Sequence, residues 1–216
     1  MLVKLILYLD YVIGTHPHED HIGGLDDVIN TFDVGKVLMP KKESTTKTFE
    51  DVLLSIQNKG LRVTTPKVGA KYNLGQAEWT ILAPSQEYEE TNNSSIVIRL
   101  IFGDDTFMFT GDAEEKSEKE ILKTGDLNSD LLKVGHHGSI SSTSIDFLKQ
   151  VKPTYAVISV GKDNRYGHPH KEIIERLTEQ NVEILRTDEL GTIILTSDGN
   201  DLNYEIIKNS ENVSNQ

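Results

Sequence analysis

The sequence predicts one α/β domain that carries its chemistry in loops at the ends of strands. Its 216 residues fit a single domain of mixed architecture. Segments with strand and helix periodicity alternate along the chain, with no repeat and no linker between them. Histidine and aspartate follow directly after several expected strands, where rigid scaffolds commonly hold functional groups. We expect residues 1–208 to form the domain and 209–216 to be a disordered polar tail.

The expected elements follow in order from two kinds of pattern. Apolar and β-branched runs bounded by turn residues predict strands at 10–15, 36–40, 79–83, 96–102, 106–110, 131–135, 155–161, 182–186 and 192–196. Apolar side chains three and four positions apart predict helices at 23–31, 45–60, 113–123, 142–150 and 171–180. The turn Gly103-Asp104-Asp105 joins two of the strands as a β-hairpin.

Composition excludes some classes of protein and site. The chain has no cysteine, so a metal would have to bind to His, Asp, Glu or Asn. The net charge of −12 argues against a basic surface and a stable nucleic-acid complex, although a transient encounter remains compatible with it. No apolar run approaches the roughly 20 residues of a membrane span, and no signal-peptide cleavage site is visible. We expect a cytoplasmic protein.

The run His16-Pro17-His18-Glu19-Asp20-His21 is the main candidate metal site. Three of the seven histidines lie within these six positions. In an extended loop His16 and His18 point to the same side and can share one ion, whereas Asp20 and His21 can reach a second. The alternative is a polar loop whose histidines have no ligand.

Two later segments could close this site. Asp112 follows a strand and could bridge two ions, or it could simply cap the next helix. His136 and His137 end another strand, and adjacent side chains of an extended chain face opposite ways, so we expect one ligand, with the other orienting it or touching substrate. Asn92 and Asn93 precede the hairpin, where a turn is the simpler interpretation.

The segment from Asn164 to His170 could contact a substrate. The forked guanidinium of Arg165 suits a phosphate, and His168 could donate a proton to a leaving oxygen. Asn164 and Tyr166, together with Ser139 in the earlier loop, are the further candidates for substrate contacts. A proline-bearing turn before a helix is the alternative.

Together these motifs resemble the metallo-β-lactamase fold superfamily. His-x-His-x-Asp-His at 16–21, the Asp at 112 and the His-Gly at 137–138 are similar to its metal motifs. Thr-Gly-Asp at 110–112, Lys-Val-Gly-His-His-Gly-Ser at 133–139 and Asn-Arg-Tyr-Gly-His-Pro-His at 164–170 more narrowly resemble the hydrolase domain of ComEC-like competence proteins and their soluble relatives. The resemblance covers roughly residues 10 to 200 and implies an αββα sandwich.

The resemblance also implies a ligand set and an activity. His16 and His18 would hold one divalent ion, zinc or manganese. Asp20, His21 and His137 would hold a second, with Asp112 bridging and His136 as the alternative to His137. The family usually supplies another histidine just before the hairpin. Here Asn93 is a weak substitute, so we expect weaker ligation there. The implied activity is that of a phosphodiesterase or DNase in which a metal-activated water attacks, with Asp20, His168 and Arg165 as catalytic groups.

Two alternatives remain open, and one departure bears on them. Related chains usually begin with strands carrying an Asp-Val-Gly-Gln-Gly-Asp-like segment, which is absent here. We therefore expect an N-terminally truncated relative whose first sheet exposes an edge, with reduced stability or self-association. The protein could instead hydrolyse a small ester, thioester or lactone, because the fold hosts many chemistries, or be an inactive remnant.

Overall fold

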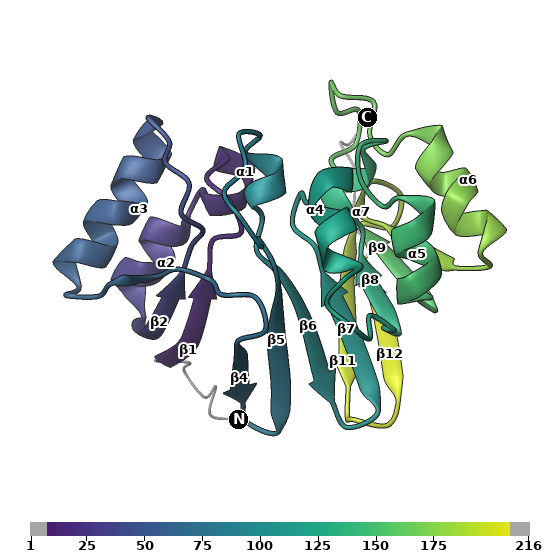
Figure 1. Ribbon diagram of the computed structural model, residues 1–216, viewed down its shortest axis with the longest axis horizontal. Coiled ribbons are helices and arrows are strands. Elements are labelled where there is room, and N and C mark those ends of the chain that lie inside the picture. The colour runs from purple at the N-terminus through teal and green to yellow at the C-terminus, as the bar shows by residue number, and fades with distance from the viewer. Residues whose placement is uncertain (1–7, 208–216) are drawn as a thin grey trace, which may run out of the picture.

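The computed structural model describes residues 8–207, which form three sheets and their covering helices (Figure 1). The strands are β1 (Tyr8–Ile13), β2 (Asp33–Leu38), β3 (Val63–Thr64), β4 (Lys71–Leu74), β5 (Ala77–Ala83), β6 (Val97–Phe102), β7 (Asp105–Phe109), β8 (Leu131–Lys133), β9 (Tyr155–Ile158), β10 (Glu183–Arg186), β11 (Thr192–Ser197) and β12 (Leu202–Ile207). The helices are α1 (Glu19–Ile22), α2 (Leu25–Thr31), α3 (Lys47–Asn58), α4 (Glu115–Ile121), α5 (Ile145–Val151), α6 (Lys171–Glu179) and α7 (Thr187–Leu190). Two short 3₁₀ turns, η1 (Asn92–Ser94) and η2 (Gly135–Gly138), interrupt the loops.

The strands pair in three groups. A seven-stranded sheet has the order β10-β9-β8-β7-β6-β5-β4, antiparallel from β4 to β7 and parallel from β7 to β10. A parallel sheet has the order β1-β2-β3, and β11 pairs with β12 as an antiparallel hairpin. The predicted hairpin is confirmed, because β6 and β7 pair across the turn at residues 103–104.

Four clusters of buried side chains stack these groups into layers. Helices α1, α2 and α3 pack on the β1-β2 sheet, whose other face packs on β5 and β6. The β11-β12 hairpin packs on the other end of that same face of the long sheet, against β7 to β10. Helices α4, α5 and α6 cover the opposite face (Figure 1). The order of layers is therefore helix, sheet, sheet, helix, as expected.

Aromatic side chains fill the space between the two sheets. The Trp79 ring is 2% exposed. It stacks on Tyr72 with ring centroids 4.4 Å apart and meets Tyr11 edge-on at 5.1 Å. Burial of such rings supplies a large share of the hydrophobic free energy of folding, so this contact fixes β1 against the long sheet. The same contact sets where the loop after β1 begins.

Most expected elements are present with shifted ends, and five were missed. Strands β3 and β4 have two and four residues, too few for a periodic signal. The one-turn helices α1, in the run expected to be a loop, and α7 have the same difficulty. The strand at 192–196 was expected to be the last, but β12 follows it, with Leu202 and Tyr204 facing the long sheet. The expectation missed this alternation because turn residues precede the strand and the polar Asn203 stands within it.

Two expectations concern the limits of the chain. Among residues 8–207, β1 pairs only with β2 and so lies at an edge of its sheet, with the Tyr8 side chain exposed. Whether this edge promotes self-association stays a prediction. The expected tail at 209–216 lies outside the described residues. No helix within the described range has the length and apolar character needed to cross a bilayer.

Candidate metal centre

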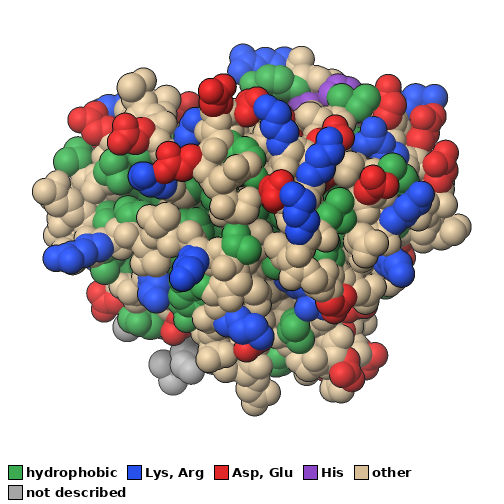
Figure 2. All heavy atoms as spheres, viewed as in Figure 1, with side chains coloured by type: hydrophobic (Ala, Val, Ile, Leu, Met, Phe, Trp, Pro, Cys, Tyr) green, Lys and Arg blue, Asp and Glu red, His purple; other side chains and the backbone are tan. Residues whose placement is uncertain are grey.

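Histidines gather where β1, β7 and β8 end. The loop after β1 carries the first histidine run, the loop after β7 carries Asp112, and the loop after β8 carries His136 and His137. Figure 2 shows histidine side chains at the upper edge of the molecule, and acidic and basic side chains are mixed across the visible face. The predicted residues from three distant segments thus meet at one edge.

Asp112 lies at the centre of this cluster, between two groups of ring nitrogens. Its Oδ1 is 3.1 Å from His21 Nε2 and 3.7 Å from His137 Nε2. Its Oδ2 is 3.8 Å from His16 Nε2 and 3.7 Å from His136 Nε2. Each oxygen therefore faces a different set of imidazoles, the arrangement that a carboxylate shared by two cations would need.

His18 and Asp20 extend the two groups toward solvent. His18 Nδ1 lies 3.0 Å from His16 Nε2, on the Oδ2 side of Asp112. Asp20 Oδ2 lies 3.2 Å from His137 Nε2, on the other side. Two sets of side chains bring ligand atoms within 4.8 Å of one another: His16, His21 and Asp112, and Asp20, His21 and His137.

The electrostatics of the cluster suit a cation. The buried Oδ1 of Asp112 accepts no hydrogen bond of ordinary geometry from the described residues. Burial alone would raise the pKa of Asp112, but contact with His21 and the charges of His137 and His16 outweigh it and hold that pKa well below its usual range. Burial, helped by His21, lowers the pKa of His16 to about 3. An ionised carboxylate beside a neutral imidazole is the protonation state that metal ligation requires.

Hydroxyl groups orient the buried part of the cluster. Ser95 Oγ lies 3.2 Å from His16 Nδ1 and accepts a hydrogen bond from the Asp112 backbone N–H at 3.0 Å. Thr15 Oγ1 lies 3.2 Å from His16 Nδ1 and 3.3 Å from His21 Nδ1. These contacts leave the Nε2 atoms of both rings directed at Asp112. We call these five residues the floor of the site.

The two adjacent histidines do not face opposite ways, so that expectation was wrong. His136 and His137 have φ values of 48° and 54°, in the left-handed region, because the chain turns sharply at η2 instead of staying extended. Both rings consequently reach Asp112. The next residue has to be glycine. Gly138 has a φ of +85°, and a Cβ atom at this position would lie only 2.5 Å from Pro169 Cβ.

His137 has an unambiguous tautomer. Its Nδ1 lies 2.8 Å from the carbonyl oxygen of Ser159, which can only accept, so Nδ1 carries the proton. The Nε2 lone pair is then free and points toward Asp112 and Asp20. Such outer hydrogen bonds are the usual way to orient a ligating histidine.

Asn93, the weak candidate ligand, is occupied by other contacts. Its Oδ1 accepts the backbone N–H groups of Glu114 and Ser117 at 3.3 and 3.1 Å, and its Nδ2 donates to Glu114 Oε2 at 3.2 Å. Its polar atoms are therefore engaged in holding the start of α4. The structure does not bring Asn93 into the group of converging ligand atoms.

Arg165, Tyr166 and Asp20 form an exposed border, which we call the rim. A pocket of about 650 Å³ lies between the floor and the rim; it is lined by His18, Glu19, Asp20, Asp112, His136, His137, Arg165, Tyr166 and His168. The Arg165 guanidinium lies over the Tyr166 ring, 4.9 Å from its centroid. Burial, followed by the charge of His136, lowers the pKa of His168.

Asn164 and Ser139 support loops. Asn164 Oδ1 accepts the N–H groups of Tyr166 and His168, and its Nδ2 donates to carbonyl groups of the same loop. Ser139 is buried, and its hydroxyl contacts that of Ser141 at 3.0 Å. Asn164 also borders a neighbouring cavity of about 370 Å³, whereas Ser139 does not line the main pocket.

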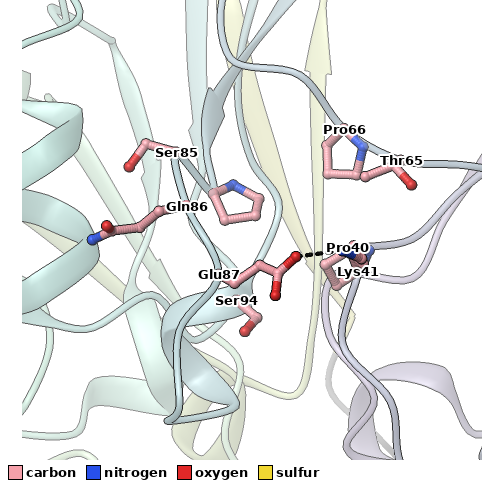
Figure 3. A pocket seen from close by; sticks show the side chains of 9 residues that line it. Pro40, Lys41, Thr65, Pro66, Ser85, Gln86, Glu87 and Ser94 are labelled. Atoms are coloured by element: carbon pink, nitrogen blue, oxygen red, sulfur yellow. Dashed lines mark hydrogen bonds and ion pairs between the residues drawn. The ribbon is translucent and has the colours of Figure 1, made fainter.

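A second cavity of about 200 Å³ lies where β2 and β5 end (Figure 3). Its charged side chains, Lys41 and Glu87, pair with each other at 2.6 Å. The rest of its lining is proline and small polar side chains. It gathers no titratable cluster, so the chemistry of the chain lies in the larger pocket.

Sequence reasoning missed the supporting residues. Thr15, Ser95, Glu114 and Ser159 were not singled out, although each contacts a histidine of the cluster. Glu114 offered a signal, since it stands two positions after Asp112 and is acidic. The other three are ordinary loop residues whose roles depend on tertiary packing.

Comparisons with known proteins identify the family of this chain and two of its relatives. Residues 5–162 match the family described as the metallo-beta-lactamase superfamily. ComE operon protein 3 of Bacillus subtilis (strain 168) is 34% identical over 89% of this chain and 25% of its own length. Competence protein ComA of Neisseria gonorrhoeae is 31% identical over 86% and 25%. The chain thus spans about a quarter of the length of these relatives, and the resemblance to competence proteins is confirmed.

Solved structures agree on the fold. The metallo-beta-lactamase fold protein YhfI from Bacillus subtilis aligns with a TM-score of 0.52 at 15% identity, over 82% of this chain and 74% of that one. CmlA, a diiron beta-hydroxylase from Streptomyces venezuelae, aligns with a TM-score of 0.58 at 13% identity, over 85% and 44%. At such identities the likeness shows the fold alone, and it confirms the expected sandwich.

Proposed function

Since the chain belongs to the metallo-beta-lactamase superfamily, whose members are generally metal-dependent hydrolases, we propose that it hydrolyses phosphodiester bonds, with single-stranded DNA bound transiently. One observation carries the proposal. The pocket whose floor holds Asp112 between two groups of imidazoles also exposes Arg165, a group suited to a phosphate.

The floor, together with His18, Asp20 and His137, fits two divalent ions of the zinc or manganese type. His16 and His18 would hold one, and Asp20, His21 and His137 the other, with Asp112 shared between them. Imidazole and carboxylate donors suit these metals, and the Asp112 oxygen without a hydrogen bond needs a positive partner. When bound, such ions would acidify a water molecule and polarise the scissile phosphoryl group.

The side chains of the rim, and His168 beside them, have separate tasks in this proposal. Arg165 binds a nonbridging phosphate oxygen through its guanidinium. Asp20, whose side chain is 63% exposed, accepts a hydrogen bond from the attacking water. His168 holds a proton on a ring nitrogen for the leaving oxygen. Tyr166 offers a flat surface on which a base can stack.

One relative's name supports a DNA strand as the substrate, and the charge of the chain limits how such a strand would bind. The name of one relative, competence protein ComA of Neisseria gonorrhoeae, refers to competence, and this chain matches it at 31% identity. The mixed surface charge and the net charge of −12 fit a brief encounter better than a stable complex. The proposed partner is therefore a short, single-stranded segment near the rim.

Hydrolysis assays test the proposal. Protein purified without chelator and supplied with Mn²⁺ or Zn²⁺ should cleave bis-p-nitrophenyl phosphate and a single-stranded oligonucleotide. His18→Ala and Asp20→Ala should each abolish cleavage, whereas Glu50→Gln, on the exposed face of α3, should not. Cleavage of a lactone but of neither phosphodiester would contradict the substrate class, and cleavage that survives both site variants would remove the site from the reaction.

A further inference from the structure

We propose that the cavity of about 370 Å³ beside the main pocket is a nucleobase subsite, which takes the base of a nucleotide next to the scissile phosphate. We call it the side cavity. Its volume lies near the lower end of the range of about 300–1,000 Å³ that is usual for small-molecule sites. The inference rests on the proposed function, because it concerns a second part of the same phosphodiester substrate.

The side cavity lies outside the carboxyl ends of two parallel strands. Strands β9 and β10 pair in parallel and end at Ile158 and Arg186. Residues 159–161, directly after β9, and Thr187, directly after β10, all line the cavity. Crevices at the carboxyl ends of parallel strands are where open α/β sheets usually bind ligands. The fold therefore offers a ligand position here, next to the metal centre.

The side cavity and the main pocket share a wall. The residues that line both are Asp20, His137, Tyr166 and His168. Asp20 and His137 belong to the candidate ligands of the second metal position, on the Oδ1 side of Asp112. A phosphate group held at that position therefore lies at the mouth of the side cavity, within reach of one of its two ester substituents.

The charges of the two cavities differ. Arg165 lines the main pocket but not the side cavity. Among the described residues, the lining of the side cavity holds one carboxylate, that of Asp20, and no lysine or arginine. A carboxylate repels a phosphate group. The phosphate thus belongs in the main pocket, and the side cavity suits an uncharged substituent.

Hydrogen bonds hold the walls of the side cavity in place. Thr187 Oγ1 accepts the N–H group of Val160 at 2.8 Å and donates to its carbonyl oxygen at 2.9 Å. Asn164 Nδ2 donates to the carbonyl oxygens of Gly161 and His168 at 3.1 and 2.6 Å. Walls fixed in this way need little ordering when a ligand enters, which favours binding.

The surface of the side cavity suits a base better than an aliphatic group. Val160 and Gly161 line it with apolar surface and backbone, against which a flat ring can lie. Ser159 holds the His137 ring through its carbonyl oxygen at 2.8 Å, which leaves its hydroxyl group for a ligand. The edge of a base carries donors and acceptors for this hydroxyl group, whereas an aliphatic substituent would leave it without a partner.

Two chromogenic diesters that differ only in the base test the subsite. They are the p-nitrophenyl esters of thymidine 5′-monophosphate and of the corresponding abasic deoxyribose phosphate, each assayed with Mn²⁺. The value of kcat/KM should be about tenfold higher for the thymidine ester, as expected for contacts to one base. Equal values for the two esters would overturn the subsite.

A variant that fills the side cavity should remove this preference. No heavy atom lies within 4 Å of where a Cβ of Gly161 would stand, and its φ lies outside the left-handed region, so a side chain fits there. Gly161→Leu should bring the ratio of the two kcat/KM values close to one. Gln57→Leu, which adds the same side chain on the exposed face of α3, should keep the preference. A preference that persists in a folded Gly161→Leu variant, as judged by its thermal melt, would contradict the proposal.

Nuclear magnetic resonance tests the same cavity without hydrolysis. In the presence of Zn²⁺, thymidine 5′-monophosphate should shift the backbone amide signals of Val160, Gly161 and Thr187, and abasic deoxyribose phosphate should not. Amide signals that stay unchanged at saturating nucleotide would overturn the subsite. Shifted signals in a chain that cleaves neither ester would refute only the proposed reaction, so the two failures can be distinguished.

Discussion

Asp112 and Asp20 are carboxylates of one site, yet the side chain of the first is 3% exposed and that of the second 63%. Asp112 belongs to a floor built at strand ends and held by hydroxyl and backbone groups. Asp20 belongs to a rim that faces solvent. Electrostatic interactions are strong in the floor and screened in the rim. On the proposed function, the floor and the ligands beside it, Asp20 included, set metal affinity, whereas Arg165 and Tyr166 of the rim set substrate preference.

Removing Asp112 should have the largest effect, because both groups of imidazoles meet at its carboxylate. Asp112→Ala should lower metal affinity and hydrolysis by more than about 100-fold, since supporting residues alone cost about 10- to 100-fold. Mass spectrometry of metal content and the rate of bis-p-nitrophenyl phosphate cleavage measure the two effects. If full metal content persists in Asp112→Ala, the floor does not have the role assigned to it.

A change at Ser95 tests whether the hydroxyl groups that orient His16 and Asp112 matter for metal affinity. Ser95→Ala removes contacts to both His16 and the Asp112 backbone. It should lower metal affinity by about 10- to 100-fold, with a matching loss of activity that excess metal partly restores. Ser129→Ala, which removes another buried hydroxyl far along the chain, is the matched control. Equal effects of the two variants would point to general destabilisation.

Arg165 tests the rim. Arg165→Ala should reduce kcat/KM for an oligonucleotide by about tenfold, because a charge-assisted hydrogen bond contributes about 1.5–3 kcal/mol and exposure reduces it. Metal content should not change. Arg165→Lys should recover part of the loss, since it keeps the charge but not the forked donors. A fall in metal content would show that floor and rim are not separable.

Tyr166 should have the smallest effect. Tyr166→Ala should raise KM for single-stranded DNA by about fivefold, near the lower limit of about 1–3 kcal/mol for stacking of one base, because the ring is exposed. Tyr166→Phe keeps the ring and should behave as the unmodified chain. An abasic oligonucleotide should show no difference between the variants. A difference with that substrate would mean that Tyr166 does not act by stacking.

The candidate ligands of the site could be predicted from the sequence, whereas the hydroxyl groups that orient them could not. His16, His18 and Asp112 stand at strand ends, where periodicity and residue type make them visible. The role of Ser95 could not be seen, because it arises only when the segment before β6 packs against the loop after β1. The predicted direction of the His136 side chain was wrong, because the prediction assumed an extended backbone where the backbone is left-handed. Periodicity gave the layers, but it missed β3 and β4, which have too few residues.

Anomalous diffraction from crystals soaked in Mn²⁺ tests the central claim most directly, that Asp112 is shared between two metal positions. The account predicts two peaks flanking its carboxylate, one beside His16 and His18 and the other beside His21 and His137. A single peak away from Asp112, or none at saturating Mn²⁺, would contradict it.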